Sequence, residues 1–158
     1  MKIRKILVPV DFEECSSAAL EEAIGFAKVF DATLELFHVL RVPAWTPGEL
    51  IVFGSGFDRE GWEEVALRNA NTALKSLAEE ASRRGASATY RAEVGVPADA
   101  IVAASAGNDI VVMGTHGRGV MGRILLGSVA NDVARRASCP VLTVRAAAVL
   151  PERATLSP

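Results

Sequence analysis

Several kinds of residue and segment are scarce in this 158-residue sequence, and each shortage excludes a class of function. The only two cysteines, Cys15 and Cys139, lie far apart and form no C-x-x-C motif, which argues against a metal–thiolate or dithiol site. We expect both to be free thiols in a reducing cytoplasm. No run of about 18 apolar residues occurs, so we expect no membrane partner. A net charge of -2 with scattered basic residues argues against nucleic acid as the main partner.

Hydrophobic side chains are plentiful instead, at 50% of all residues. A chain of this length buries roughly 68–70% of its unfolded surface, so one domain with a substantial core is expected over residues 1–146. The apolar run that ends at Pro9 predicts a first strand rather than a signal peptide. Residues 41–61 contain prolines and glycines that break any period, and they predict a semi-ordered flap. Residues 147–158 are expected to form a loosely ordered tail.

Strand-like apolar runs alternate with helical patterns along the chain. This alternation predicts an α/β fold, with a single doubly wound five-stranded parallel sheet of Rossmann-like kind and strand order 3-2-1-4-5. Ser16 or Ser17 is expected to cap the first helix, and the second helix to bury a face that includes Trp62, Val65 and Ala81. The predicted strands are 3–10, 33–40, 88–94, 109–114 and 140–145, and the predicted helices are about 16–30, 62–84, 97–106 and 128–137.

The most distinctive stretch, Gly114 to Ser128, lies between the fourth strand and the fourth helix and contains five glycines. Glycine lets the backbone approach a ligand closely, and a helix N-terminus offers unpaired N–H groups to an anion. The stretch therefore predicts a phosphate-binding loop. It is not a P-loop, because no lysine follows residue 75, and its single G-x-G-x-x-G match, from Gly117 to Gly122, is weak by itself. The alternative is a long surface loop that the glycines merely shape.

The predicted strand order reverses between the first and fourth strands, and a ligand crevice is expected at their carboxyl ends. Asp11 and the glycine loop then face one crevice. An aspartate beside polyphosphate would cost on the order of 1–4 kcal/mol at 4 Å, so Asp11 should face the sugar or base. The alternative for Asp11 is a simple turn residue. Arg118 and Arg123 are free to reach the outer phosphates, or are solvated loop charges.

The spacing Gly114-x-x-Gly117, nine residues, then Gly127-Ser128 resembles the nucleotide-binding signature of the universal stress protein family, ATP-binding branch. The resemblance runs from Val8-Pro-Val-Asp-Phe to Cys139-Pro-Val-Leu-Thr-Val-Arg. It implies an adenine nucleotide alpha hydrolase-like fold and a nucleotide-responsive regulatory module in the stress response. Val10 is a mild departure, because some members carry a hydroxyl residue there.

The resemblance also implies which residues bind ATP. Asp11 and its neighbours would line the nucleoside, the Val39 backbone would read the adenine edge, and the glycine motif would hold ribose and phosphates. The implied cofactor-binding residues are Pro9, Val10, Asp11, Val39, Met113, Gly114, Gly117, Gly127, Ser128 and Val129.

Binding does not require catalysis, and we predict no catalytic residues and at most very slow hydrolysis. His116 is the one candidate base in the loop, and it is as readily a solvated turn residue. Without a dedicated metal site, Mg²⁺ would be carried on the ATP phosphates. Two alternatives stay open: a slow ATPase or other nucleotide-processing enzyme, and a dimeric interaction module that binds AMP or flavin.

The last predicted strand, Pro140–Arg145, carries no charge before its final residue, yet the topology leaves it at a sheet edge. Such an edge invites pairing with another chain. We predict a homodimer through antiparallel pairing of this strand, as the resemblance also implies. The competing possibility is that residues 146–150 fold back over the edge. The downstream protein partner is not identified by the sequence.

Overall fold

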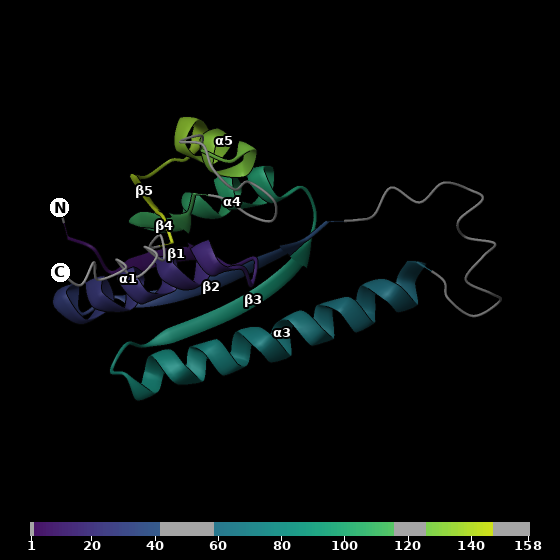
Figure 1. The fold of residues 1–158 in the computed structure, drawn as a ribbon, viewed down its shortest axis with the longest axis horizontal. Coiled ribbons are helices and arrows are strands. Elements are labelled where there is room, and N and C mark those ends of the chain that lie inside the picture. Colours follow the sequence, from purple (N-terminus) through teal and green to yellow (C-terminus); the bar gives the residue numbers. More distant parts are fainter. Residues whose placement is uncertain (1, 42–58, 116–125, 147–158) are drawn as a thin grey trace, which may run out of the picture.

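The computed structural model describes residues 2–41, 59–115 and 126–146 (Figure 1). Strands and helices alternate through these residues. In chain order they are β1 (Lys5–Pro9), α1 (Glu14–Phe30), β2 (Thr33–Leu40), α3 (Arg59–Arg83), β3 (Ala88–Val94), α4 (Pro97–Ser105), β4 (Ile110–Gly114), α5 (Ser128–Arg136) and β5 (Val141–Val144).

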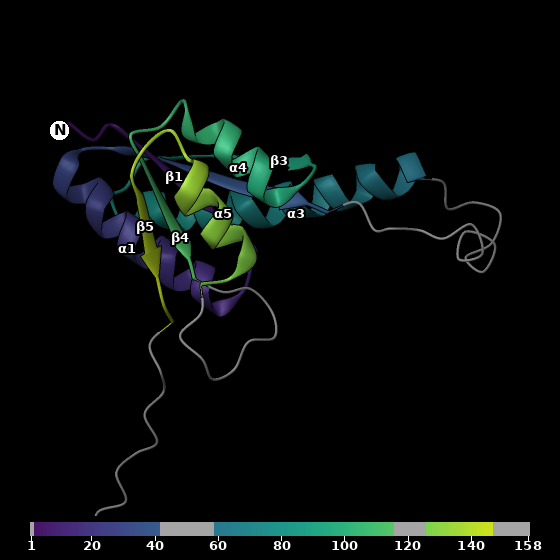
Figure 2. The ribbon, with the colours of Figure 1, turned by 90° about the horizontal axis from the view of Figure 1, so that it is seen from above.

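The predicted sheet is confirmed: its strands pair in parallel, in the order β3-β2-β1-β4-β5. The helices cover it on both faces. Helices α4 and α5 lie side by side over one face, and α1 and α3 cover the other (Figures 1 and 2). The central strand β1 is buried from Ile6 to Pro9, which explains why its sequence is a continuous apolar run rather than an alternating one.

The core forms two layers, one on each side of the sheet. Alternate residues of one strand therefore serve different layers: Ile6 and Val8 pack towards α1 and α3, whereas Leu7 packs towards α4 and α5. Small alanines on the helices, such as Ala23 and Ala130, let the helix backbones approach the strands closely. The two layers pack on both sides of the strands, and the candidate site lies at the carboxyl ends of β1 and β4.

The start of α1 differs from the prediction. The helix begins at Glu14 without a side-chain cap, and the hydroxyls of Ser16 and Ser17 donate instead to the Glu13 carbonyl oxygen, at 3.0 and 3.1 Å. The predicted serine cap is therefore wrong. The physical reason is the preceding turn, in which Phe12 takes a left-handed conformation (φ 63°) and starts the helix earlier.

The buried face of α3 is also only partly the predicted one. Ala81 is buried as expected, but Leu74 is fully buried and Val65 is 48% exposed. In Figure 1, the N-terminal part of α3 extends beyond the end of β3. Residues in that part have no strand of this sheet edge to pack against, so an apolar pattern does not guarantee burial there.

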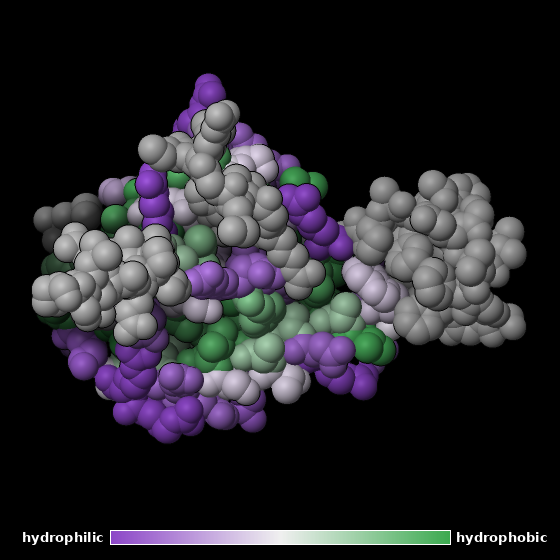
Figure 3. Space-filling view, in the orientation of Figure 1, coloured by the Kyte–Doolittle hydropathy of each residue, from purple (hydrophilic) through white to green (hydrophobic). Residues whose placement is uncertain are grey.

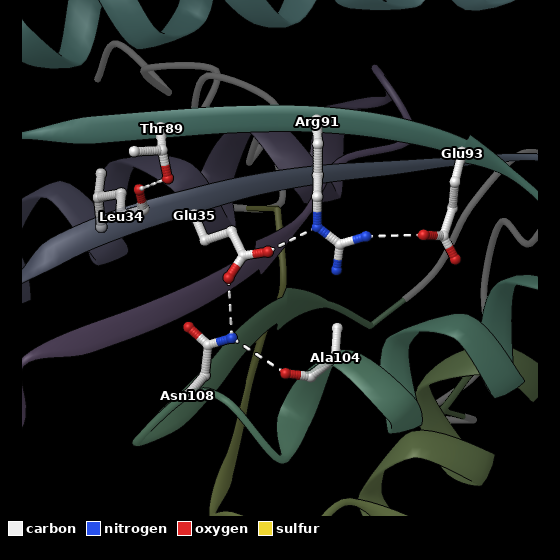
Figure 4. A network of polar contacts seen from close by, with 7 residues as sticks. All are labelled: Leu34, Glu35, Thr89, Arg91, Glu93, Ala104 and Asn108. Carbon is white, nitrogen blue, oxygen red and sulfur yellow. Dashed lines mark hydrogen bonds and ion pairs between the residues drawn. The ribbon is translucent and has the colours of Figure 1, made fainter.

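A polar network joins β2, β3 and the segment before β4 (Figure 4). Arg91 donates to Glu35 through Nε and to Glu93 through a terminal nitrogen, both at 2.7 Å, and its guanidinium lies 3.8 Å from the centre of the Phe37 ring. The Asn108 amide nitrogen donates to the other Glu35 oxygen and to the Ala104 carbonyl, both at 3.0 Å. Arg91 thus covers part of the sheet face that α4 and α5 leave open.

The cysteines are both free thiols, as expected. Burial, together with the nearby carboxylate of Asp109, raises the pKa of the Cys139 thiol. Asp109 itself accepts the backbone N–H groups of Arg4 and Lys5, and these bonds lower its pKa. In the described part of the chain, each helix is too short or too polar to cross a membrane.

Candidate functional site

A cavity of about 570 Å³ opens at the carboxyl ends of β1 and β4, where the strand order reverses. The position is the one expected for a ligand site in a doubly wound sheet. Its volume falls within the roughly 300–1,000 Å³ typical of small-molecule sites. The described residues that line it are Pro9, Val10, Asp11, Glu13, Ser16, Phe37, His38, Val39, Arg41, Pro97, Ile101, Met113, Gly114, Thr115, Gly127, Ser128, Val129 and Ala130.

The end of β1 forms one wall and is held in place by β2. The Val10 N–H donates to the Phe37 carbonyl oxygen at 2.8 Å, and the His38 ring nitrogen Nδ1 lies 2.6 Å from the Val10 carbonyl oxygen. Because a carbonyl oxygen only accepts, Nδ1 must carry the proton of this bond. The Phe12 ring packs 4.8 Å from the His38 ring. These contacts fix the backbone that leads into Asp11.

Asp11 has a structural role in the turn that follows β1. One of its carboxylate oxygens accepts the Glu13 N–H at 3.0 Å, which is the turn role considered as an alternative for this residue. The side chain is exposed and lines the cavity. A carboxylate has more acceptor positions than this one bond uses, so the turn role leaves Asp11 able to accept hydrogen bonds from a ligand.

Gly114 ends β4 against the first turn of α1. A Cβ at this position would lie 2.8 Å from the Cys15 carbonyl carbon and 2.8 Å from the Cys15 Cβ. The contact involves backbone, which cannot swing aside as a flexible side chain can. Gly114 is therefore required for close packing of β4 on α1. Gly114 also lines the cavity, so this packing shapes the cavity wall.

The opposite wall is the N-terminus of α5. The Gly127 N–H donates to the Thr115 carbonyl oxygen at 2.7 Å, which brings the two ends of the glycine-rich stretch together. Gly127 is the N-cap, and none of the described side chains caps the helix. The first N–H groups of a helix have no partner within it and carry a partial positive charge. Those of Ser128 and Val129 are therefore suited to an anion.

Nine of the ten residues implied by the family resemblance line this cavity, from four different parts of the chain. The tenth, Gly117, lies outside the described residues, as do His116, Arg118 and Arg123. Residues that the sequence reasoning missed include Arg41, Pro97 and Thr115. Their only signal was position, because each directly follows a strand or begins a helix at the same end of the sheet.

The described walls combine groups that accept hydrogen bonds with groups that donate them. Charged side chains are few: the carboxylates of Asp11 and Glu13 and the guanidinium of Arg41. Within residues 2–41, 59–115 and 126–146, no three histidine, cysteine or acidic side chains gather as metal ligands. A carboxylate on one side and helix N–H groups on the other suit a ligand with hydroxyls at one end and an anionic group at the other.

The sequence profile of the universal stress protein family matches residues 2–145. This chain belongs to that family. The universal stress protein MJ0531 of Methanocaldococcus jannaschii is 36% identical over 148 residues, which cover 90% of this chain and 82% of that protein. The structure of MJ0577, a universal stress protein of the same organism, superposes with a TM-score of 0.76 at 28% identity, over 92% of this chain and 97% of that one.

One further structural relative of this universal stress protein was solved with a ligand. It is a universal stress protein in complex with cAMP, 25% identical, with a TM-score of 0.59 over 91% of this chain and 98% of that one. The predicted fold, of the adenine nucleotide alpha hydrolase-like type, is therefore supported by the sequence match to the family and by the similar solved structures.

Proposed function

We propose that this universal stress protein is a cytoplasmic regulatory module that binds ATP in the cavity at the ends of β1 and β4. The observation that carries the proposal is the pairing of an exposed carboxylate, Asp11, with the uncapped N-terminus of α5 across one cavity. Mg²⁺ would be carried on the nucleotide phosphates. We expect hydrolysis to be very slow.

The charges dictate the orientation of the nucleotide. The phosphates lie towards the N–H groups of Ser128 and Val129, where the helix dipole favours negative charge. Asp11 then accepts from the ribose hydroxyls, away from the phosphates. The base lies against Val39, whose backbone reads the adenine edge. Pro9, Val10, Met113, Gly114, Gly117 and Gly127 complete the proposed binding residues.

A smaller adenine nucleotide is the second candidate ligand. It is favoured by the relative solved with cAMP, because that ligand has a single phosphate. AMP or cAMP would use the same base and ribose contacts but fewer of the α5 N–H groups. Affinity that rises with each added phosphate supports ATP, and equal affinity for AMP and ATP supports the alternative.

The first experiment is to denature freshly purified protein and identify any released nucleotide by chromatography. We expect near-stoichiometric ATP, which would show both binding and slow hydrolysis. Mostly ADP would instead favour a slow ATPase. Absence of nucleotide, together with no binding after ATP and Mg²⁺ are added, would contradict the proposal.

Two variants assign the binding to this cavity. Asp11→Ala removes charge-assisted hydrogen bonds worth about 1.5–3 kcal/mol, so ATP affinity should fall about 10- to 100-fold. Gly127→Lys should abolish binding, because its side chain would enter the cavity at the α5 N-terminus. The matched control is Asp132→Ala, which removes an exposed carboxylate of α5 that does not line the cavity. Isothermal titration calorimetry measures all three.

We also propose a homodimer through Pro140–Arg145. The Pro140 and Val144 carbonyl oxygens accept N–H groups of Val111 and Thr115, so even-numbered residues of β5 face β4 and the odd-numbered ones face outward. Thr143→Pro removes an outward N–H and leaves the bonds to β4 in place. If β5 pairs with a second copy, this change should abolish the pairing through β5 while circular dichroism stays unchanged.

A further inference from the structure

The opposite edge of the sheet, β3, has a regular row of backbone groups that face away from β2. The Leu34 N–H donates to the Ser87 carbonyl oxygen at 2.8 Å, and the Gly95 N–H donates to the Leu40 carbonyl oxygen at 2.9 Å. Backbone groups alternate in direction along a strand, so the backbone N–H and C=O groups of the odd-numbered residues of β3 point towards β2. The outward N–H and C=O groups belong to the even-numbered residues Ala88, Tyr90, Ala92 and Val94.

The side chains of β3 alternate between two faces. Thr89, Arg91 and Glu93 lie on the face that carries the polar network of Figure 4. On the other face, Ala88 and Ala92 pack against the core layer beneath α3. Arg91 and Glu93 thus lie two residues apart on one face, with Ala92 between them, and they already form an ion pair with each other at 2.7 Å within the chain.

This charge order selects one register for pairing with a second copy of the chain. If β3 pairs antiparallel with Ala92 opposite Ala92, the outward backbone groups of both strands meet as hydrogen-bonded pairs. Arg91 of each copy then lies opposite Glu93 of the other copy. Centring the pairing on Arg91 or on Glu93 instead would oppose like charges, which is destabilising.

The other face of β3 offers apolar surface in the same register. Tyr90 is 39% exposed and lies opposite Val94 of the second copy when Ala92 is at the centre. Tyr90 also lines a shallow hollow between α3 and the strand, and the other residues that line it are Lys75, Ala78, Glu79, Ser82, Arg83 and Ala88. Figure 3 shows hydrophobic residues in the region of β3 and α3, bordered by hydrophilic ones. Aromatic–aliphatic pairs of this kind stabilise antiparallel strands.

We propose that a second copy of this chain binds along β3, antiparallel and centred on Ala92, so that Arg91 and Glu93 form reciprocal ion pairs across a twofold axis. The interface is separate from β5, which lies at the other end of the sheet. The inference goes beyond the proposed function and does not need a bound nucleotide. Where both edges pair, sheets continue from copy to copy and dimers join into longer assemblies.

Sedimentation of proline variants separates the two edges. Ala92→Pro removes an outward N–H of β3 without a loss to the β2 ladder, just as Thr143→Pro does at β5. We expect the Thr143→Pro variant to reach a mass of two chains through β3, and the Ala92→Pro/Thr143→Pro double variant to remain a single chain. Circular dichroism controls for folding. A Thr143→Pro variant that remains a single chain at every soluble concentration would overturn the proposal but not the β5 dimer.

Charge variants test the register, in the Thr143→Pro background so that only β3 pairs. Glu93→Arg places arginines opposite one another, and we expect self-association to weaken about tenfold or more. Arg91→Glu places glutamates opposite one another. Mixed in equal amounts, the two variants should associate with each other better than either does alone. Failure to do so, with Glu93→Arg self-associating as the parent does, would overturn the register.

The dependence of association on salt concentration tests the ion pairs without changing Arg91 or Glu93. At 1 M salt the Debye length falls to about 3 Å, so the contribution of these exposed pairs is screened. Association through β3 should weaken as salt rises, whereas the β5 strand Val141–Val144 has no charged residue and its pairing should not. Association of the Thr143→Pro variant that strengthens with salt would contradict the reciprocal ion pairs.

Discussion

Gly114→Ala is expected to lower the free energy of unfolding by about 1–3 kcal/mol, the usual cost of an extra methyl group in a closely packed core. The new Cβ would lie 2.8 Å from the Cys15 carbonyl carbon, closer than such atoms approach. Either β4 or the first turn of α1 must move. Both elements carry cavity residues, so the proposed ATP binding should be lost with the stability. Urea denaturation and calorimetry measure the two effects.

Gly25→Ala is the matched control for this change. Gly25 lies within α1, and nothing comes within 4 Å of a Cβ built there. Alanine loses less backbone entropy than glycine in a helix, so this variant should be more stable by roughly 0.5–1 kcal/mol and bind ATP normally. If Gly114→Ala were as stable as the Gly25→Ala variant, β4 would not be packed on α1 as described.

Arg91→Met should lower the free energy of unfolding by about 2 kcal/mol. Hydrogen bonds to charged groups contribute about 1.5–3 kcal/mol, but the Arg91 and Glu35 side chains are 42% and 26% exposed, which reduces the ion-pair share. The rest comes from the guanidinium over Phe37, since methionine covers the ring with its chain but lacks the charge. Lysine, with no planar fork, should restore only part of the loss.

The same variant should change how stability depends on pH. Burial raises the pKa of Glu35, but the bond from Arg91 and that from Asn108 outweigh it, and the net pKa lies below the usual 4.5. A lowered folded pKa stabilises the fold above the unfolded value, and the stabilisation is lost as the pH falls through the folded value. The difference between wild type and Arg91→Met should therefore shrink from pH 7 to about pH 3.

Denaturation at several pH values measures this difference. Glu93→Gln is the matched control, because Glu93 also bonds to Arg91 but is 43% exposed. It should leave most of the acid dependence in place. A difference between wild type and Arg91→Met that stays constant down to pH 3 would assign the acid dependence to groups other than Glu35.

The strands could be predicted from the sequence because strand-forming patterns are local. The bounds of β2 and β3 agree with the prediction, since each is a run of strand-forming residues between clear breaks. The strand order followed from handedness rules, and it located the cavity. Asp11 was reached in the same way, from its place after β1. Such arguments need only the chain direction and the alternation of elements.

Contacts between residues that are far apart in the sequence could not be predicted from such local patterns. That Gly114 packs on Cys15 depends on how α1 crosses β4, which no local pattern encodes. The bond between His38 and Val10 joins residues 28 positions apart, and the cover of Phe37 by Arg91 depends on strand register. The serine cap was predicted wrongly from a local pattern, because the start of α1 depends on the left-handed Phe12, a conformation that sequence rarely reveals.

The bond between the Gly127 N–H and the Thr115 carbonyl oxygen makes the protein an attractive scaffold for loop exchange. It joins the residue after β4 to the residue before α5, at the two ends of the segment between them. The entropic cost of closing a loop grows only slowly with length, about 0.6 kcal/mol for each doubling. We therefore expect the fold to tolerate segments of different length and sequence between Thr115 and Gly127. Ligand choice can then be varied while the rest of the fold is kept.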